Sequence, residues 1–302
     1  MRIEHDALGE RQLDENLYYG IQTQRAKENF GISGKTISHI PGFVESIIQI
    51  KKAAAIANQR ANVLSLDVCD AICQAADEML IGLDPTNFVI DIYHGGGGTS
   101  ANMNVNEVLA NRANEIITGK KGYESVHPNT HVNMGQSTND VIPAAMKMAV
   151  FNAMLDLEKS LKDFVVSLRN KEIEFNEVVK LGRTCFQDAL PITLGQQFSG
   201  YRNAFERMIT EVQTTREACL ELPLSATAIG TEFGTFPGYK EHIFKALQSI
   251  TNQKWKVEDN LFDGLQNADL WAKVSAVTKA IALNLNKLAG DLRLMSSGPR
   301  AG

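Results

Sequence analysis

Apolar side chains recur at helical spacing in three long segments of the chain. The segments begin after Pro143, at Leu194 and at Leu270, and the intervening positions are largely charged or small. Each covers roughly 25 to 30 residues, or about 40 Å, well above the length of an average globular helix. We therefore predict three long amphipathic helices. Their apolar positions are Met146, Val150, Leu157, Leu161, Phe164 and Leu168; Leu194, Phe198, Tyr201, Phe205, Met208 and Val212; and Leu270, Val274, Val277, Ile281, Leu285, Leu288, Leu292 and Met295.

The first 140 residues have a more mixed pattern. One helix is predicted after Pro41, a favourable first residue for a helix, and two stretches rich in Gly, Asn, Ser and Thr indicate loops. The apolar face of this helix contains Val44, Ile47, Ile48, Ala54 and Ala55. We expect a mainly α protein of two domains: a small α-rich domain with the loops at residues 1–140, and a bundle of long helices at residues 141–302.

The long helices also predict self-association. Their apolar stripes are wider than the narrow seam of a two-stranded coiled coil, which favours a bundle buried on more than one side. One chain is too short to cover every stripe. We therefore expect the bundle to be incomplete in this chain and to be covered by further copies.

Composition and charge exclude several classes of function. With 302 residues and 44% hydrophobic side chains, the chain can bury one large core or two modest ones. The net charge of −5 and the dispersed Lys and Arg residues argue against nucleic acid as a partner. No run approaches the roughly 18 apolar residues of a membrane span, and residues 1–6 contain no apolar leader. A cytoplasmic location without a membrane partner is expected, in agreement with only four cysteines.

The first loop with possible chemistry, His94–Asn104, joins four glycines to neutral hydrogen-bond donors. Glycines allow backbone N–H groups to converge, and such a nest at the start of a helix suits a carboxylate or a phosphate. A flexible turn before an ordinary helix explains the pattern equally well. From the residues alone, both interpretations stay open.

The second loop, Gln136–Asp140, supplies the short neutral donors Ser137, Thr138 and Asn139. These could bind a dianion and stabilise negative charge that develops during a reaction. The alternative is a helix cap, because Ser, Thr, Asn and Asp are the preferred N-cap residues. Without further information, the residue types favour capping.

The third loop, Gly182–Pro191, contains Thr184 and Cys185, and a solvated connection between helices explains it as well as a binding loop does. No His or Lys lies close to Cys185 in the sequence, which argues against a cysteine nucleophile. His127 and His131 lack an evident third ligand, and we predict no metal site and expect hydrogen bonding within a loop there.

The order and separation of these three loops resemble the aspartase/fumarase superfamily, and further similar segments extend the resemblance over essentially the whole chain. Those segments are Tyr18–Gly20, Gln22–Thr23, Glu28–Phe30, Ser225–Thr231 and Leu294–Gly302. Within the superfamily, Arg2–Asp6, Thr99–Asn104 and Ser137–Asn139 are more similar to the aspartate ammonia-lyase (aspartase) branch than to class II fumarases. Fumarases usually read Ser-Ser-Asn at the last of these positions. They also carry a histidine in place of Cys185 and an aspartate in place of Thr130.

The resemblance implies a homotetramer that reversibly deaminates L-aspartate to fumarate and ammonia without a cofactor, with each active site built by three subunits. It implies that the hydroxyls and the amide of the first two loops grip the substrate carboxylates and stabilise an enediolate-like intermediate, and that Thr184 lies near the amino group. The implied substrate-binding residues are Thr99, Ser100, Ser137, Thr138, Asn139, Thr184 and Cys185. A class II fumarate hydratase acting on malate is the alternative within the superfamily. A non-catalytic helical oligomeric fragment is the alternative of another class.

The catalytic base of the superfamily is, by the same resemblance, a serine in a Gly-Ser-Ser-x-Met-Pro-x-Lys-x-Asn loop. That segment does not occur in the 302 residues. Ser296 and Ser297 lack its Met-Pro continuation, and we expect them in the last turn of a helix instead. We therefore expect that the base, the rest of the bundle and a third domain are absent from this chain, and that this chain alone lacks lyase activity.

Overall fold

The computed structural model describes residues 1–298, and their contacts group the chain into two compact units. The first unit comprises Met1–Val150 and Cys219–Asn267, and the second comprises Phe151–Ala218 and Ala268–Gly302. Residues 299–302, which end both the second unit and the segment Leu294–Gly302, lie outside the described residues. The domain boundary expected between residues 140 and 141 stays a prediction.

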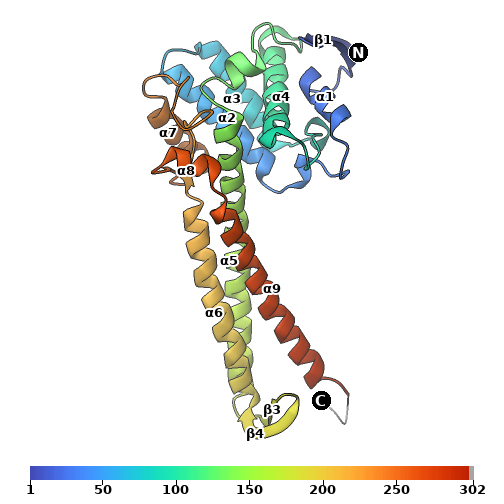
Figure 1. The fold of residues 1–302 in the computed structure, drawn as a ribbon, viewed down its shortest axis with the longest axis vertical. Coiled ribbons are helices and arrows are strands. Elements are labelled where there is room, and N and C mark those ends of the chain that lie inside the picture. Colours follow the sequence, from blue (N-terminus) through green and yellow to red (C-terminus); the bar gives the residue numbers. More distant parts are fainter. Residues whose placement is uncertain (299–302) are drawn as a thin grey trace. The chain divides into compact units, whose positions relative to one another are not determined.

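The first unit contains the shorter helices and the start of a long one (Figure 1). Helix α2 packs against α3, α4 and α7, and Val44, Ile47 and Ile48 on its apolar face are completely buried. This confirms the helix predicted after Pro41. The elements are β1 (Arg2–Asp6), β2 (Gly9–Leu13), α1 (Ile21–Asn29), α2 (Phe43–Arg60), α3 (Leu66–Ile81), α4 (Thr99–Thr118), the beginning of α5 (Thr138–Glu174), β5 (Glu221–Leu222), α7 (Tyr239–Thr251), β6 (Lys256–Val257) and α8 (Leu261–Gln266). Strands β1 and β2 pair antiparallel, and β5 and β6 pair parallel.

The second unit contains the rest of α5, an antiparallel hairpin of β3 (Val179–Thr184) and β4 (Gln187–Thr193), α6 (Leu194–Ala218) and α9 (Asp269–Met295). Phe164 of α5 meets Phe205 of α6 edge-on, with ring centroids 4.9 Å apart. Tyr201 of α6 donates a hydrogen bond of 2.6 Å to Asp291 of α9. The three predicted long helices are thus confirmed, as is the mainly α fold class.

The start of the first long helix differs from the prediction. Helix α5 begins at Thr138 and includes Pro143 in its early turns. Proline lacks a backbone N–H and therefore removes only one hydrogen bond there, at the carbonyl of Asn139. The helix can start earlier because Ser137 caps it, as described below. At the other end, α9 stops at Met295 with Ser296 as its C-cap, so Ser296 closes the helix and Ser297 directly follows it, one residue beyond the last helical turn that was expected to hold both.

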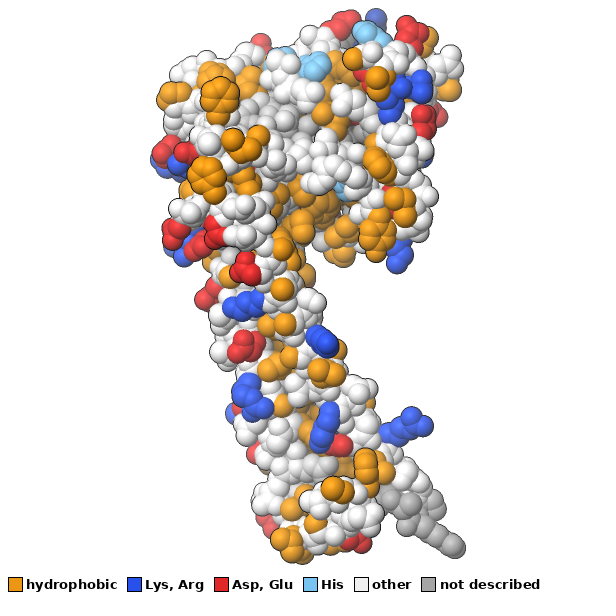
Figure 2. Space-filling model, viewed as in Figure 1, with side chains coloured by type: hydrophobic (Ala, Val, Ile, Leu, Met, Phe, Trp, Pro, Cys, Tyr) orange, Lys and Arg blue, Asp and Glu red, His pale blue; other side chains and the backbone are white. Residues whose placement is uncertain are grey.

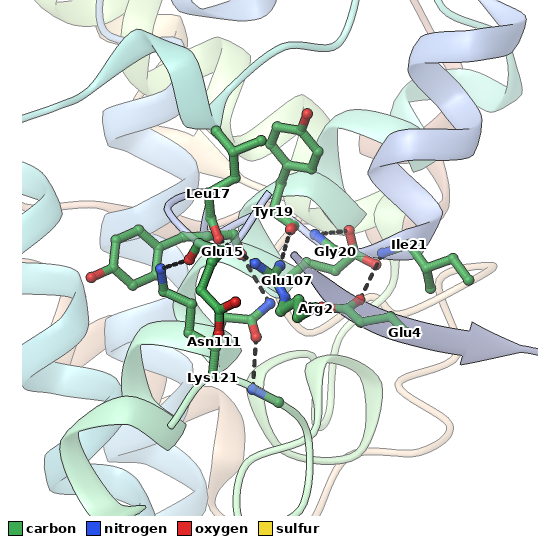
Figure 3. A network of polar contacts seen from close by, with 12 residues as sticks. Arg2, Glu4, Glu15, Leu17, Tyr19, Gly20, Ile21, Glu107, Asn111 and Lys121 are labelled. Carbon is green, nitrogen blue, oxygen red and sulfur yellow. Dashed lines mark hydrogen bonds and ion pairs between the residues drawn. The ribbon is translucent and has the colours of Figure 1, made fainter. Parts of the chain in front are cut away.

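Helix α1 is capped from a distance. Its N-cap residue, Gly20, has no side chain, and the carboxylate of Glu107 in α4 accepts hydrogen bonds of 2.9 to 3.0 Å from the backbone N–H groups of Gly20, Gln22 and Thr23. Glu4 of β1 accepts a fourth, from Ile21, at 2.8 Å (Figure 3). All four N–H groups that a helix start leaves without partners are therefore satisfied by buried carboxylates.

None of the helices within residues 1–298 combines the length and the apolar character needed to span a membrane.

Candidate functional site

The glycine-rich loop lies directly against the start of α5. Gly96, Gly97 and Gly98 adopt φ angles of 72°, 60° and 99°, a left-handed conformation that favours glycine. A Cβ atom on Gly98 would lie 2.7 Å from Cγ1 of Ile142. Only glycine allows this close approach, which brings the first predicted loop beside the second.

Thr99 and Ser100 open helix α4 at the end of this loop. The Thr99 hydroxyl is exposed and donates a hydrogen bond of 2.7 Å to the carbonyl of Gly96, and Ser100 is half-buried. The N-cap residue Gly98 has no side chain that could accept a hydrogen bond. The backbone N–H groups at the positive end of the α4 dipole are therefore not capped by this residue.

Ser137 and Asp140 form the cap of α5. The Ser137 hydroxyl accepts a hydrogen bond of 3.2 Å from the N–H of Asn139, and the Ser137 N–H donates one of 2.9 Å to the Asp140 carboxylate. The two bonds form a variant of the capping box, in which Ser137 accepts from the second helical residue, Asn139, and donates to the third, Asp140. The capping role that the residue types favoured is therefore present, carried by two residues of the loop.

Thr138 and Asn139 have other partners. The Thr138 hydroxyl accepts a hydrogen bond of 3.3 Å from the side-chain amide of Asn102, and the Asn139 amide donates one of 2.8 Å to the carbonyl of Ala228. Thr138 is half-buried, and no atom of residues 1–298 accepts its own hydroxyl proton. The capping box therefore does not account for the whole loop. The hydroxyl protons of Ser137 and Thr138 both lack an acceptor among residues 1–298.

Two buried ionisable groups, Lys51 of α2 and Asp140 at the end of the loop, were not among the site residues predicted from the sequence. Lys51 of α2 is completely buried, and its Nζ atom donates a hydrogen bond of 2.7 Å to Oδ1 of Asn133. Burial lowers the pKa of Lys51 to about 7, while the charge of Asp140 opposes the shift. Burial raises the pKa of Asp140 to about 7, against the hydrogen bonds from the N–H groups of Ser137 and Thr227 and the charge of Lys51. One signal was available: Lys51 falls on the apolar stripe of its helix, where a charged residue is unexpected.

Thr184 and Cys185 are neighbours at the tip of the β3–β4 hairpin in the second unit. Cys185 and Phe186 form its two-residue turn with φ angles of 50° and 61°, as in a type I′ turn. Neither is glycine, so the turn is strained, and strained residues cluster at functional sites. Cys185 lines an open recess of about 380 Å³ together with Arg183 and Lys287. Five of the predicted residues thus lie in the first unit, where Ser137, Thr138 and Asn139 are consecutive, and the remaining two lie in the second.

The two histidines do not indicate a metal. His127 Nδ1 accepts hydrogen bonds of 3.2 Å from the N–H groups of Asn129 and Thr130. The expected hydrogen bonding is present, but it caps a short π-helix, Pro128–Val132, where a loop was predicted. Within the described part of the chain, no group of three or more His, Cys, Asp or Glu side chains is arranged to hold a metal ion.

The chain is similar to known proteins over almost its whole length. A family model described as "Lyase" matches residues 9–302. The chain belongs to this lyase family. Relatives in the family include the aspartate ammonia-lyases of Bacillus subtilis, 45% identical, and of Helicobacter pylori strain 26695, 43% identical. Both alignments cover 100% of this chain, and 63% and 65% of the respective relatives.

A solved structure of the same family has the same fold. The fumarate lyase:delta crystallin of Brucella melitensis, in a crystal structure bound to cobalt, superimposes with a TM-score of 0.97 at 40% identity. The alignment covers 100% of this chain and 66% of that one. The chain thus spans about 65% of the length of the relatives that it matches.

Proposed function

We propose that the whole protein is a carbon–nitrogen lyase that converts L-aspartate to fumarate and ammonia in a reversible reaction. The observation that carries the proposal is the unused hydroxyl donor of Thr138, which lies beside Ser137 at the positive end of α5. The aspartate ammonia-lyase relatives, at 43 to 45% identity over the whole of this chain, support the same reaction.

The chemistry of the reaction needs such donors. Deamination begins with loss of the C3 proton of aspartate, which is weakly acidic because it lies next to a carboxylate. The electron pair left behind spreads onto that carboxylate, and the C2–N bond then breaks to release ammonia and form the double bond of fumarate. Fixed donors aimed at the growing negative charge lower the barrier, and one such donor contributes about 100-fold or more in rate.

In this proposal, Ser137, Thr138 and Asn139 bind the carboxylate that receives the charge. Thr99 and Ser100 bind the substrate from the start of α4, which Gly98 holds next to α5. Thr184 lies near the amino group, with Cys185 beside it. The proposal assigns no proton-abstracting base to residues of this chain.

The experiment uses the whole protein with L-aspartate and L-malate as separate substrates, and follows the ultraviolet absorbance of fumarate. We expect fumarate from aspartate and release of an equal amount of ammonia. Turnover of malate with none of aspartate would instead identify a fumarate hydratase. Turnover of neither substrate would favour a non-catalytic helical assembly.

We further propose that the protein is a cytoplasmic homotetramer assembled through the long helices. Large apolar side chains are exposed on α5 and α9 of the second unit, between charged ones, and Figure 2 shows hydrophobic side chains at this surface. They are Val166, Ile173, Leu283, Leu285, Leu292 and Leu294. Cys69, Cys73 and Cys185 are free thiols, as is usual in a reducing compartment. Cell fractionation and light scattering of the purified whole protein test the two parts.

A further inference from the structure

The inference below rests on the proposed function and concerns how the Thr138 donor is oriented. A hydroxyl can donate or accept, and an amide can be turned so that either its nitrogen or its oxygen faces a neighbour. The direction of such a hydrogen bond is defined only where a partner has no choice. A buried lysine is a partner of this kind, because an ammonium group donates and cannot accept.

Lys51 and one backbone carbonyl fix the orientation of Asn133. The Lys51 Nζ atom lies 2.7 Å from Asn133 Oδ1, so that position must be the oxygen. The other end of the same amide, Nδ2, donates to the carbonyl of Gln136 at 3.3 Å, which only a nitrogen can do. Two independent partners thus require the same orientation. When Lys51 is a neutral amine, which can both donate and accept, the carbonyl of Gln136 still requires this orientation.

Asn133 in turn fixes Asn102. Its Oδ1 atom is an acceptor, so the atom of Asn102 that lies 3.1 Å away must be the nitrogen. The same Nδ2 group lies 3.3 Å from the Thr138 hydroxyl oxygen and donates to it. The Asn102 oxygen is buried with no hydrogen-bond partner among residues 1–298. This orientation of the Asn102 amide therefore leaves its buried oxygen without a hydrogen bond.

We propose that Lys51, acting through Asn133 and Asn102, makes Thr138 a donor toward the substrate. Because the Thr138 oxygen accepts from Asn102, its proton must point away from Asn102, and the open surface of the loop offers that direction. In this donor chain, Asn133 Oδ1 accepts from both Lys51 and Asn102, and Asn102 also donates to Thr138. Lys51, Asn133 and Asn102 are positioning residues, and only Thr138 touches the substrate.

The test reverses one bond without changing the size of the side chain. In Asn102→Asp, a carboxylate accepts the Thr138 proton and turns it away from the substrate. We expect kcat/KM for aspartate to fall about 100-fold, as for loss of a transition-state donor. The double variant Asn102→Asp/Thr138→Val should be no slower than Thr138→Val alone, because both changes remove the same donor. A purely structural role of Asn102 would instead make the two losses multiply.

A second variant tests the contribution of Lys51. Lys51→Met removes the fixed donor, and since Gln136 still holds Asn133, we expect a smaller loss, about tenfold in kcat/KM. The matched control is Lys52→Met. Lys52 is the next residue of α2 and pairs with Asp77 at 2.5 Å, outside the donor chain. The activity of Lys52→Met should therefore equal that of the wild type. Folded Asn102→Asp with kcat/KM within threefold of the wild type would overturn the proposal.

Neutron diffraction of deuterium-exchanged crystals of the wild-type chain provides a test without activity. Nitrogen and oxygen scatter neutrons differently and deuterium is visible, so the map shows both amides and the Thr138 hydroxyl. We expect Asn102 to present its nitrogen to Thr138 and the O–D bond to point away from it. An O–D bond directed at Asn102 excludes the proposal even if the enzyme deaminates aspartate. The expected map supports it even if aspartate is not the substrate or a variant fails to fold.

Discussion

At the residue scale, Ser137 and Thr138 are adjacent hydroxyls with different partners. The Ser137 hydroxyl accepts from the N–H of Asn139 and caps α5, the Thr138 hydroxyl accepts from Asn102, and neither hydroxyl proton has an acceptor among residues 1–298. In the proposed function both hydroxyls serve the reaction, but only that of Ser137 also stabilises the start of α5. A comparison of the two variants separates these contributions.

We expect Ser137→Ala to lower kcat/KM for aspartate by about 100-fold and also to lower the free energy of unfolding by about 1 kcal/mol, because the cap is lost. Thr138→Val should lower kcat/KM by a similar factor while the free energy of unfolding stays closer to that of the wild type. Steady-state kinetics and urea unfolding of the whole protein measure the two quantities. An unchanged rate with a lower melting temperature in both variants would leave the loop with a capping role alone.

Lys51 and Asp140 give the stability of the protein a defined dependence on pH. Between about pH 4 and 7, folded Asp140 retains a proton that the unfolded chain has released, so the free energy of unfolding falls as the pH rises. Between about pH 7 and 10, the unfolded chain retains a Lys51 proton that the folded chain has lost, so the free energy rises. The contribution of this pair is therefore smallest near pH 7.

The alkaline part of this dependence belongs to Lys51. Between pH 7.5 and 9.5, we expect the wild type to gain stability relative to Lys51→Met by up to about 1.4 kcal/mol per pH unit. Urea midpoints at several pH values measure the difference, and Lys52→Met should follow the wild type. Parallel curves for Lys51→Met and the wild type would show that Lys51 keeps its ordinary pKa in the folded protein.

The sequence could predict the residues at the surface of the site but not those that orient them. Ser137, Thr138 and Asn139 are recognisable because they form a continuous polar run. Lys51 and Asn133 are 82 positions apart, and only packing of α2 against the segment before α5 brings them together. Neither residue type nor spacing indicates such a contact.

At the scale of single elements, α1 shows a helix that depends on a residue outside itself. The carboxylates of Glu107 and Glu4 accept the hydrogen bonds of the first backbone N–H groups of α1, and Glu107 is more than 80 positions away in the sequence. Burial raises the pKa of Glu107, against the hydrogen bonds from Thr23 and Gln22. A single buried carboxylate therefore joins α4 to the start of α1 (Figure 3).

We expect Glu107→Gln to lower the free energy of unfolding by about 1 to 3 kcal/mol. The glutamine amide has one oxygen, so its NH2 group would face a backbone N–H group of α1 that the carboxylate of Glu107 accepts from. Thermal unfolding of the purified variant measures the loss. Glu124→Gln, an exposed change of the same kind in the same unit, is the matched control. Equal melting temperatures for the two variants would show that the cap contributes no net stability.

Elements with a strong periodic pattern were predictable, and those defined by turns were not. Helices α6 and α9 start within a residue of the apolar repeats that predict them. The β3–β4 hairpin was not predicted, because its turn consists of Cys185 and Phe186 instead of the Asn-Gly or Asp-Gly pairs that mark a type I′ turn. The start of α5 was placed too late, because Pro143 was interpreted as the entrance of the helix rather than a residue of its early turns.

At the scale of the whole molecule, the exposed apolar residues of the second unit lead to a prediction about assembly. We expect Leu283→Lys, a change at a side chain that is 59% exposed, to shift the whole protein from tetramer to smaller species in light scattering. The reason is that a charge would have to be buried between helices of neighbouring copies. Ile81→Lys, at a side chain of the first unit that is 89% exposed, should leave the mass unchanged. Retention of the tetramer by Leu283→Lys would show that this position lies outside the interface.

The first unit is made of two stretches, and this determines the order in which it can form during synthesis. Helix α7, which packs on α2, belongs to the second stretch, and Tyr239 at its start lies under Gly135, where a Cβ would come within 3.1 Å of the tyrosine ring. A ribosome adding about 5 to 20 residues per second reaches α7 on the order of ten seconds after α2. During that interval, α2 has been made but the helix that packs on it, with Tyr239 at its start, has not. The nascent chain therefore passes through a stage in which an apolar helix face is open to chaperones and to aggregation.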